Sequence, residues 1–71
     1  MKVIYDPETD TLNFILRDEV VVESDELSEG LIVDYNRDNK IVSIEVLDAS
    51  ENVIQPKAIV YEIKEAMPVG I

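Results

Sequence analysis

Alternating hydrophobic and polar residues along the first two thirds of the chain predict a succession of β-strands. Leu12, Phe14 and Leu16 recur at every second position, so they share one face of an extended segment, which we expect to be core. β-Branched and aromatic residues fill the other candidate segments, while Asp, Asn, Pro and Gly gather between them. The expected strands are residues 2–5, 11–16, 20–26, 31–35 and 41–47.

The strongest pattern is a hairpin formed by Leu31–Tyr35 and Ile41–Leu47. Residues 36–40 join the two arms, and their Asn and Asp side chains tolerate the left-handed conformations of a tight connection. The residues of the second arm that we expect to be buried are Val42, Ile44 and Val46. Together these spacings predict one α+β domain over residues 1–71, a small antiparallel β-meander of four to five strands with a short C-terminal helix.

Beyond Leu47 the pattern changes toward helix. Asp48 is a candidate helix N-cap with Glu51 as its reciprocal partner, which predicts one or two helical turns. Pro56 suits the first position of a further helix over residues 56–67, where apolar residues recur at four-residue spacing at Ile59, Ile63 and Met67. Residues 58–63 also alternate acceptably as a strand, so strand remains the alternative to the favoured helix.

Composition narrows the possible chemistry. A chain of 71 residues lies near the lower limit for folding without external support. It contains no Cys and no His, which removes disulfides, thiolate zinc sites and the familiar catalytic triads and dyads. Oligomerisation, an oxygen-ligated ion or efficient packing remains as support. We therefore expect neither an enzyme nor a bound cofactor.

The chain is strongly acidic. Six Lys and Arg residues against sixteen Asp and Glu residues give a formal net charge of −10, which repels nucleic acid phosphates and anionic membranes. The longest apolar runs span only a few residues, far short of the ~20 that cross a bilayer. The N-terminal segment has no apolar run typical of a secretion signal. We expect a cytoplasmic protein that binds neither nucleic acid nor membrane directly.

Residues 18–29 carry six carboxylates and no Lys or Arg. The acidic residues are Asp18, Glu19, Glu23, Asp25, Glu26 and Glu29. One interpretation is a solvated edge that maintains solubility and discourages strand-to-strand aggregation. The other is a docking surface for a basic protein, where complementary charge accelerates encounter.

The predicted hairpin turn matches a calcium-binding loop in the types and spacing of its residues. Asp34, Asn36, Asp38 and Glu45 have the spacing of the side-chain ligands in that loop, and the Lys40 carbonyl adds another oxygen. Calcium loops of this type lie between two helices, however, whereas this one lies between two strands. At ~3.3 Å per residue an extended second arm places Glu45 far from the turn. We therefore favour an Asx-rich hairpin turn, with cation binding as the alternative.

Two sequence motifs resemble a family of short prokaryotic proteins of unknown function. That family opens Y-D-x-x-x-D-x-L-x-F/I-x-L and carries a central v-D-Y-D-x-D-G-x-I-v-G-I-E-I-L-D-A-S. Residues 5–16 read YDPETDTLNFIL and residues 33–50 read VDYNRDNKIVSIEVLDAS. The resemblance covers roughly residues 1–55. The departures are Asn36 where the family has Asp, and Asn39 and Ser43 where it has Gly.

The resemblance implies a small β-sheet domain with a C-terminal helix, and it assigns no catalytic residue. Genes of this kind are often placed beside small toxin-like proteins, which suggests an antitoxin or immunity-type partner. Our leading hypothesis is an acidic protein-binding domain, a homodimer, that binds a small basic toxin through residues 18–29 and its C-terminal segment. The alternatives are a divalent-cation-binding or metal-dependent protein using the Asp34–Glu45 loop, and a self-assembling structural module.

Overall fold

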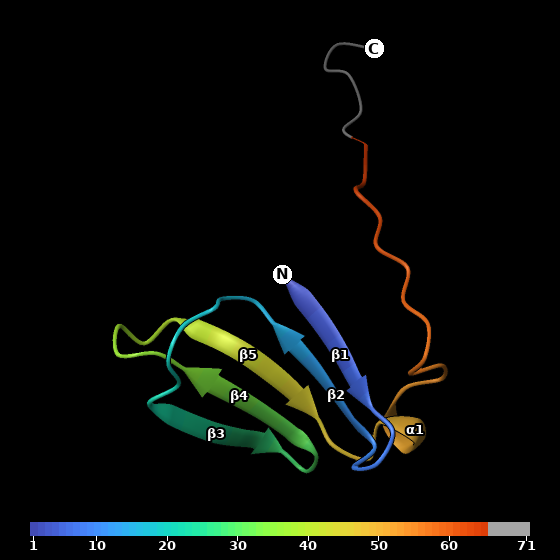
Figure 1. Cartoon of the computed structure of the whole chain (residues 1–71), viewed down its shortest axis with the longest axis horizontal. Coiled ribbons are helices and arrows are strands. Elements are labelled where there is room, and N and C mark those ends of the chain that lie inside the picture. Colours follow the sequence, from blue (N-terminus) through green and yellow to red (C-terminus); the bar gives the residue numbers. More distant parts are fainter. Residues whose placement is uncertain (66–71) are drawn as a thin grey trace.

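One antiparallel sheet of five strands is formed between residues 2 and 46, as seen in a computed structural model that describes residues 1–65 (Figure 1). The elements are β1 (Lys2–Asp6), β2 (Thr11–Ile15), β3 (Glu23–Ser28), β4 (Leu31–Tyr35), β5 (Ile41–Val46) and α1 (Ala49–Asn52). Within residues 1–65, α1 is the single helix, and no helix has the length and apolar character that spanning a bilayer requires.

Four of the five strands lie where the alternation predicts them, but β3 begins at Glu23 rather than at Val20. The shift has a topological reason. The connection after β2 crosses to the far edge of the sheet, and pairing with β4 starts only where the Val22 N–H donates to the Tyr35 carbonyl oxygen at 2.9 Å. Residues 16–22 are used for that crossing.

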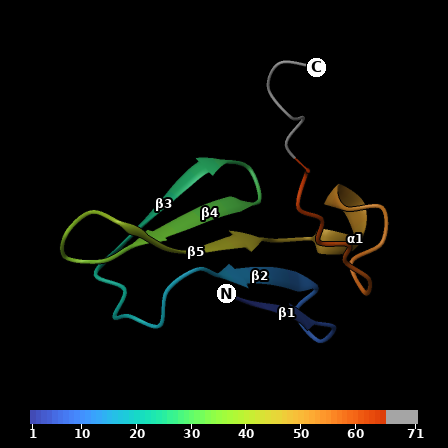
Figure 2. The same ribbon diagram turned by 90° about the horizontal axis from the view of Figure 1, so that it is seen from above.

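The strand order is β1-β2-β5-β4-β3. Strands β3, β4 and β5 follow one another as a meander, and the β1–β2 hairpin is added on the free side of β5. The expected antiparallel sheet with one short C-terminal helix is therefore confirmed, but the meander comprises only β3, β4 and β5, because β2 pairs with β5 and not with β3. Figure 2 shows α1 at one end of the twisted sheet, beyond β5.

The register divides the side chains between two faces of the sheet. Leu12 lies opposite Tyr5 and Val46, and Val33 lies opposite Ile44, so these residues share what we call the apolar face. The buried hydrophobic residues are Leu12, Val33, Val42 and Ala49. Phe14, Ile44 and Val46 are only half-buried, Leu16 is exposed, and no large side chain in residues 1–65 is fully buried. The core is therefore thin.

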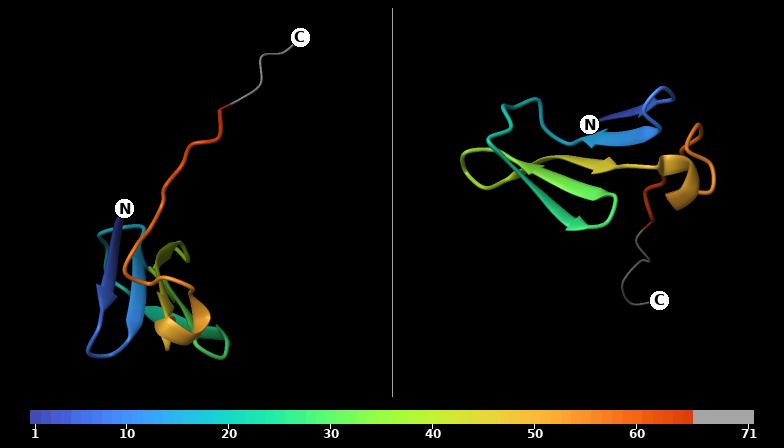
Figure 3. Two further views of the ribbon diagram at one scale, coloured as in Figure 1. Left: turned by 90° about the vertical axis from the view of Figure 1, so that its right-hand side faces the viewer. Right: turned by 90° about the horizontal axis from the view of Figure 1, so that it is seen from below.

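The helix predicted over residues 56–67 is wrong in its described part. Residues 58–65 contain neither helix nor strand, and Figure 3 shows this segment, drawn in orange and red, leaving the sheet. Positions 66 and 67 lie outside the described residues. β-Branched Ile59, Val60 and Ile63 lose side-chain freedom in a helix, and a short helix is marginal unless it buries a face against other elements. Ile59, Val60 and Ile63 are exposed here, so that packing is missing.

Candidate functional site

Asp10 joins the turn between β1 and β2 to the start of α1. Its Oδ1 accepts hydrogen bonds from the Tyr5 hydroxyl at 2.8 Å and from the Ser50 N–H at 3.1 Å. Its Oδ2 accepts the Ser50 hydroxyl at 2.6 Å, and its backbone oxygen accepts the Ala49 N–H at 2.8 Å. These contacts fasten two parts of the chain that are distant in sequence.

The N-terminus of α1 is thus capped from outside the helix. Asp48 occupies the N-cap position as predicted, but within residues 1–65 its side chain makes no capping hydrogen bond, and the predicted exchange with Glu51 is not formed. Asp10 supplies the acceptor instead. The Ser50 and Tyr5 hydroxyls lower the pKa of Asp10, and the hydrogen bond to Asp10 raises the pKa of Tyr5. We assign this group of residues to holding the fold.

A second set of polar contacts lies on the face opposite the apolar face. Asp34 is 6% exposed, and its two carboxylate oxygens accept the hydroxyls of Ser24 at 2.5 Å and Ser43 at 2.6 Å. Glu45 lies two residues beyond Ser43 on the same face of β5. We call Ser24, Asp34, Ser43 and Glu45 the polar cluster. Asp34 and Glu45 thus point to the other side of the sheet from Val33 and Val42.

The pKa values of the two carboxyl groups in the polar cluster are shifted in opposite directions. Desolvation opposes the ionisation of Asp34, but the hydrogen bonds from Ser24, Ser43 and Glu45 together outweigh it and lower the pKa of Asp34. The hydrogen bond with Asp34, then desolvation and the Asp34 charge, raise the pKa of Glu45. Across the strand pair from Glu45, Asn13 Oδ1 is buried without a hydrogen-bond partner among the described residues. Glu45 therefore ionises at a cost to the folded state.

Replacing Glu45 with Gln is expected to raise the melting temperature at neutral pH and to have no such effect in acid. A group whose pKa is raised on folding contributes stability below its unfolded value, here 4.5, and loses that contribution as the pH rises through the folded pKa. Gln removes this loss while keeping a donor toward Asp34. Thermal melts followed by circular dichroism across the acid to neutral range measure the difference.

Glu26→Gln is the matched control for Glu45→Gln, because it removes one negative charge from an exposed position on the same face. In a chain of net charge −10, any lost carboxylate reduces general repulsion. The excess gain of Glu45→Gln over Glu26→Gln is the part that belongs to the polar cluster. Equal gains at neutral pH would contradict a local cause.

The candidate cation ligands do not converge. Asn36 Oδ1 accepts the N–H groups of Asp38 and Lys40, both at 2.9 Å, and its Nδ2 donates to Glu19 Oε2 at 2.6 Å. Asp34 and Glu45 belong to the polar cluster on the sheet, and Asp38 is exposed in the turn. Residues 1–65 contain no group of three or more acidic side chains placed to hold a metal ion. The Asx-rich turn between β4 and β5 therefore explains Asn36 and Asp38, and the polar cluster explains Asp34 and Glu45.

The acidic stretch forms one border of the molecule. Strand β3 is the last strand of the sheet, and all six of its residues are exposed. Three of the six candidate partner-binding residues, Glu23, Asp25 and Glu26, lie on β3 itself. Asp18 and Glu19 lie in the connection before it, where Glu19 pairs with Arg17 at 3.0 Å, and Glu29 lies in the turn after it. We call β3 with these flanking carboxylates the acidic edge.

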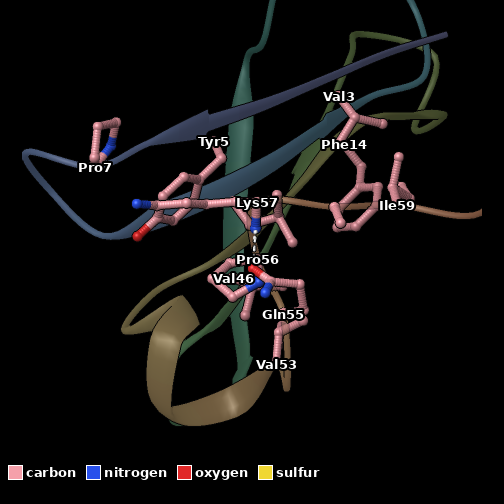
Figure 4. Close-up of a pocket in the computed structure, with 12 residues that line it drawn as sticks. Val3, Tyr5, Pro7, Phe14, Val46, Val53, Gln55, Pro56, Lys57 and Ile59 are labelled. Atoms are coloured by element: carbon pink, nitrogen blue, oxygen red, sulfur yellow. Dashed lines mark hydrogen bonds between the residues drawn. The ribbon is translucent and has the colours of Figure 1, made fainter.

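A groove that the sequence did not indicate lies on the apolar face (Figure 4). Its volume is about 630 Å³, within the usual range of ligand pockets. The sheet supplies Val3, Tyr5, Leu12, Phe14 and Val46, and the chain after α1 supplies Val53 and residues 55–59. The alternation in β1, β2 and β5 signals the sheet wall, but nothing local signals that residues 53–59 return to face it.

The fold and these surfaces define a small acidic β-sheet domain with an open edge strand and an uncovered apolar groove, in which the paired polar groups hold the structure together. The chain belongs to the DUF2283 family, proteins of unknown function, whose model matches residues 2–50. This confirms the expected membership in a family of unknown function. The match includes all five strands and Ser50, whereas the groove wall formed by residues 53–59 lies beyond it. No curated protein and no solved structure matches the chain.

Proposed function

We propose that this protein is a cytoplasmic protein-binding domain that captures a basic partner along the acidic edge. The observation that carries the proposal is β3 itself, an edge strand with all six residues exposed and three of them carboxylates. An edge strand presents unpaired backbone N–H and C=O groups on its outer side. An extended partner segment is therefore able to add to the sheet by main-chain hydrogen bonds.

Side chains of β3 supply specificity for a basic segment. Successive residues of a strand point to opposite faces, so Glu23 and Asp25 flank the added strand on one face and Glu26 on the other. Lys or Arg side chains at alternate positions of the partner reach these carboxylates. A small basic toxin, the partner that the sequence resemblance suggests, has this chemistry, and long-range attraction to a chain of charge −10 accelerates its approach.

The test looks for a small basic protein encoded beside this gene, which is then purified and titrated by calorimetry at low and high salt. We expect binding that weakens as salt rises, because exposed charges are screened. The combined substitutions Glu23→Gln, Asp25→Asn and Glu26→Gln are expected to weaken it at least about tenfold. The matched control is Glu8→Gln, Asp38→Asn and Glu51→Gln, which removes the same charge from exposed positions outside the acidic edge.

Two outcomes would contradict the proposal. The first is no binding of that neighbouring protein at low salt. The second is an equal loss of affinity in the β3 variant and the control, which would leave net charge alone as the cause. Aggregation of the β3 variant without loss of binding would assign the carboxylates to protecting the open edge instead. The cation-binding alternative has no comparable support in residues 1–65, where the candidate ligands are used by the turn and the sheet.

A further inference from the structure

No second layer covers the apolar face of the sheet in residues 1–65. A sheet with one hydrophobic face is stable when another element buries that face, yet α1 covers only one end of this sheet (Figure 2).

The chain after the groove wall also carries apolar residues that no described part of the chain covers. Residues 55–59 form one wall of the groove, and Figure 4 shows Ile59 close to Val3 and Phe14. Over residues 60–65 the chain leaves the sheet (Figure 3). Val60, Tyr61 and Ile63 are 80%, 75% and 83% exposed. A run of exposed apolar residues next to an open apolar groove indicates that each lacks its partner.

We propose that residues 60–63 of a second copy of this chain occupy the groove, so that two copies exchange these segments reciprocally. Tyr61 and Ile63, two positions apart in an extended segment, point to the same side and enter the groove together. The first copy's residues 55–59 stay in place as the groove wall. The inference is independent of the acidic edge, which lies at the opposite border of the sheet from β1.

Charge favours a second copy over an unrelated acidic or basic occupant. Residues 1–55 carry the entire formal charge of −10, whereas residues 56–71 contain two Lys and two Glu and are neutral. The segment that enters the groove therefore adds nothing to the repulsion between the two acidic bodies. Among the described residues that line the groove, Lys57 is the only charged one, and Glu62 lies between Tyr61 and Ile63 in the incoming segment. The two therefore have complementary signs.

Analytical ultracentrifugation of the full chain over a concentration series tests the exchange. The native chain is expected to sediment as a dimer, and Tyr61→Asp with Ile63→Asp to raise the dissociation constant at least about a hundredfold. Val20→Asp with Ile54→Asp is the matched control: it adds the same charge at 79% and 104% exposed apolar positions outside the groove. All four side chains are exposed, so we expect unchanged circular dichroism. A native monomer, or a dimer equally sensitive to both pairs, would overturn the proposal.

Cross-linking identifies which copy supplies the segment, and it is clean because the chain has no Cys. Isotope-labelled Val3→Cys chains are mixed with unlabelled Tyr61→Cys chains and treated with a short thiol-reactive cross-linker. We expect cross-linked pairs between labelled and unlabelled chains, and far fewer when Ile54→Cys replaces Tyr61→Cys. A chain carrying both Val3→Cys and Tyr61→Cys that closes on itself as a monomer would assign the groove to its own segment and overturn the exchange.

Discussion

Replacing Asp34 with Ala is expected to lower the free energy of unfolding by about 2–4 kcal/mol. Asp34 is buried between β3 and β5, and it accepts the hydroxyls of Ser24 and Ser43. Ala leaves the buried Ser43 hydroxyl without its acceptor and Glu45 without its partner. Because the stability of small domains is only about 5–15 kcal/mol, this loss is a large fraction of the total. Urea unfolding followed by circular dichroism measures it.

Asp34→Asn is the control for shape, since it keeps one carbonyl acceptor in nearly the same volume. We expect it to lose clearly less stability than Asp34→Ala. Hydrogen exchange of the β3 amides provides the local readout, and these amides should lose protection before those of β4. A loss below about 1 kcal/mol for Asp34→Ala, the range of ordinary surface changes, would refute the role assigned to the polar cluster.

The polar cluster matters because β3 has little else to hold it. All six residues of β3 are exposed, so the strand buries no apolar side chain against the sheet. Its attachment consists of the backbone pairing with β4 and the bond from Ser24 to Asp34. The acidic edge therefore depends on a carboxylate behind it, and a variant that loses Asp34 is expected to disturb partner binding indirectly.

Sequence reasoning succeeded where the pattern is local. The period-two alternation of Leu31–Tyr35 and Ile41–Val46, with Asn and Asp between them, was sufficient to predict β4, β5 and their turn. The bonding of Asn36 to its own turn also agrees with the preference for an Asx-rich turn. In such segments neighbouring residues determine the structure, so the local sequence is sufficient to predict it.

Contacts between distant segments were not predictable in the same way. Asp10, in the first turn, caps a helix that starts at Ala49. Neither the sequence of the turn nor that of the helix indicates this contact. The hint was the pair of motifs in the family resemblance, one containing Tyr5 and Asp10 and the other Ser50. Burial of Asp34 was equally hidden, because an alternating strand suggests a solvent-facing carboxylate and only the register brings two serines to it.

The C-terminal segment shows the limit of periodicity. Ile59 and Ile63 have helical spacing, and residues 58–63 also alternate like a strand, but either element needs a surface against which to pack. Residues 60–65 are exposed and pack against no other described part of the chain, so neither element forms. The sequence contains the apolar residues without indicating whether the same chain or another one buries them.

Replacing Leu12 with Ala is expected to cost about 2–4 kcal/mol of unfolding free energy. Leu12 is 7% exposed, lies between Tyr5 of β1 and Val46 of β5, and lines the groove. The core holds few other buried apolar residues, so the loss of Leu12 removes a large share of the apolar surface that folding buries. Leu16→Ala is the control: Leu16 is 40% exposed, and its loss should stay near or below about 1 kcal/mol. Equal losses in chemical denaturation would contradict a core centred on β2 and β5.

The Leu12 variant also distinguishes an effect on folding stability from an effect on dimerisation. If a second copy occupies the groove, folding is coupled to association, and the native melting temperature rises with protein concentration. Leu12→Ala removes part of the groove floor and should therefore lower both the melting temperature and its dependence on concentration. Tyr61→Asp with Ile63→Asp should abolish the concentration dependence and leave the melting temperature near the value that the native chain has at low concentration, because these exposed side chains make no part of the core. A Leu12→Ala protein that keeps the full concentration dependence would place the dimer contact away from the groove.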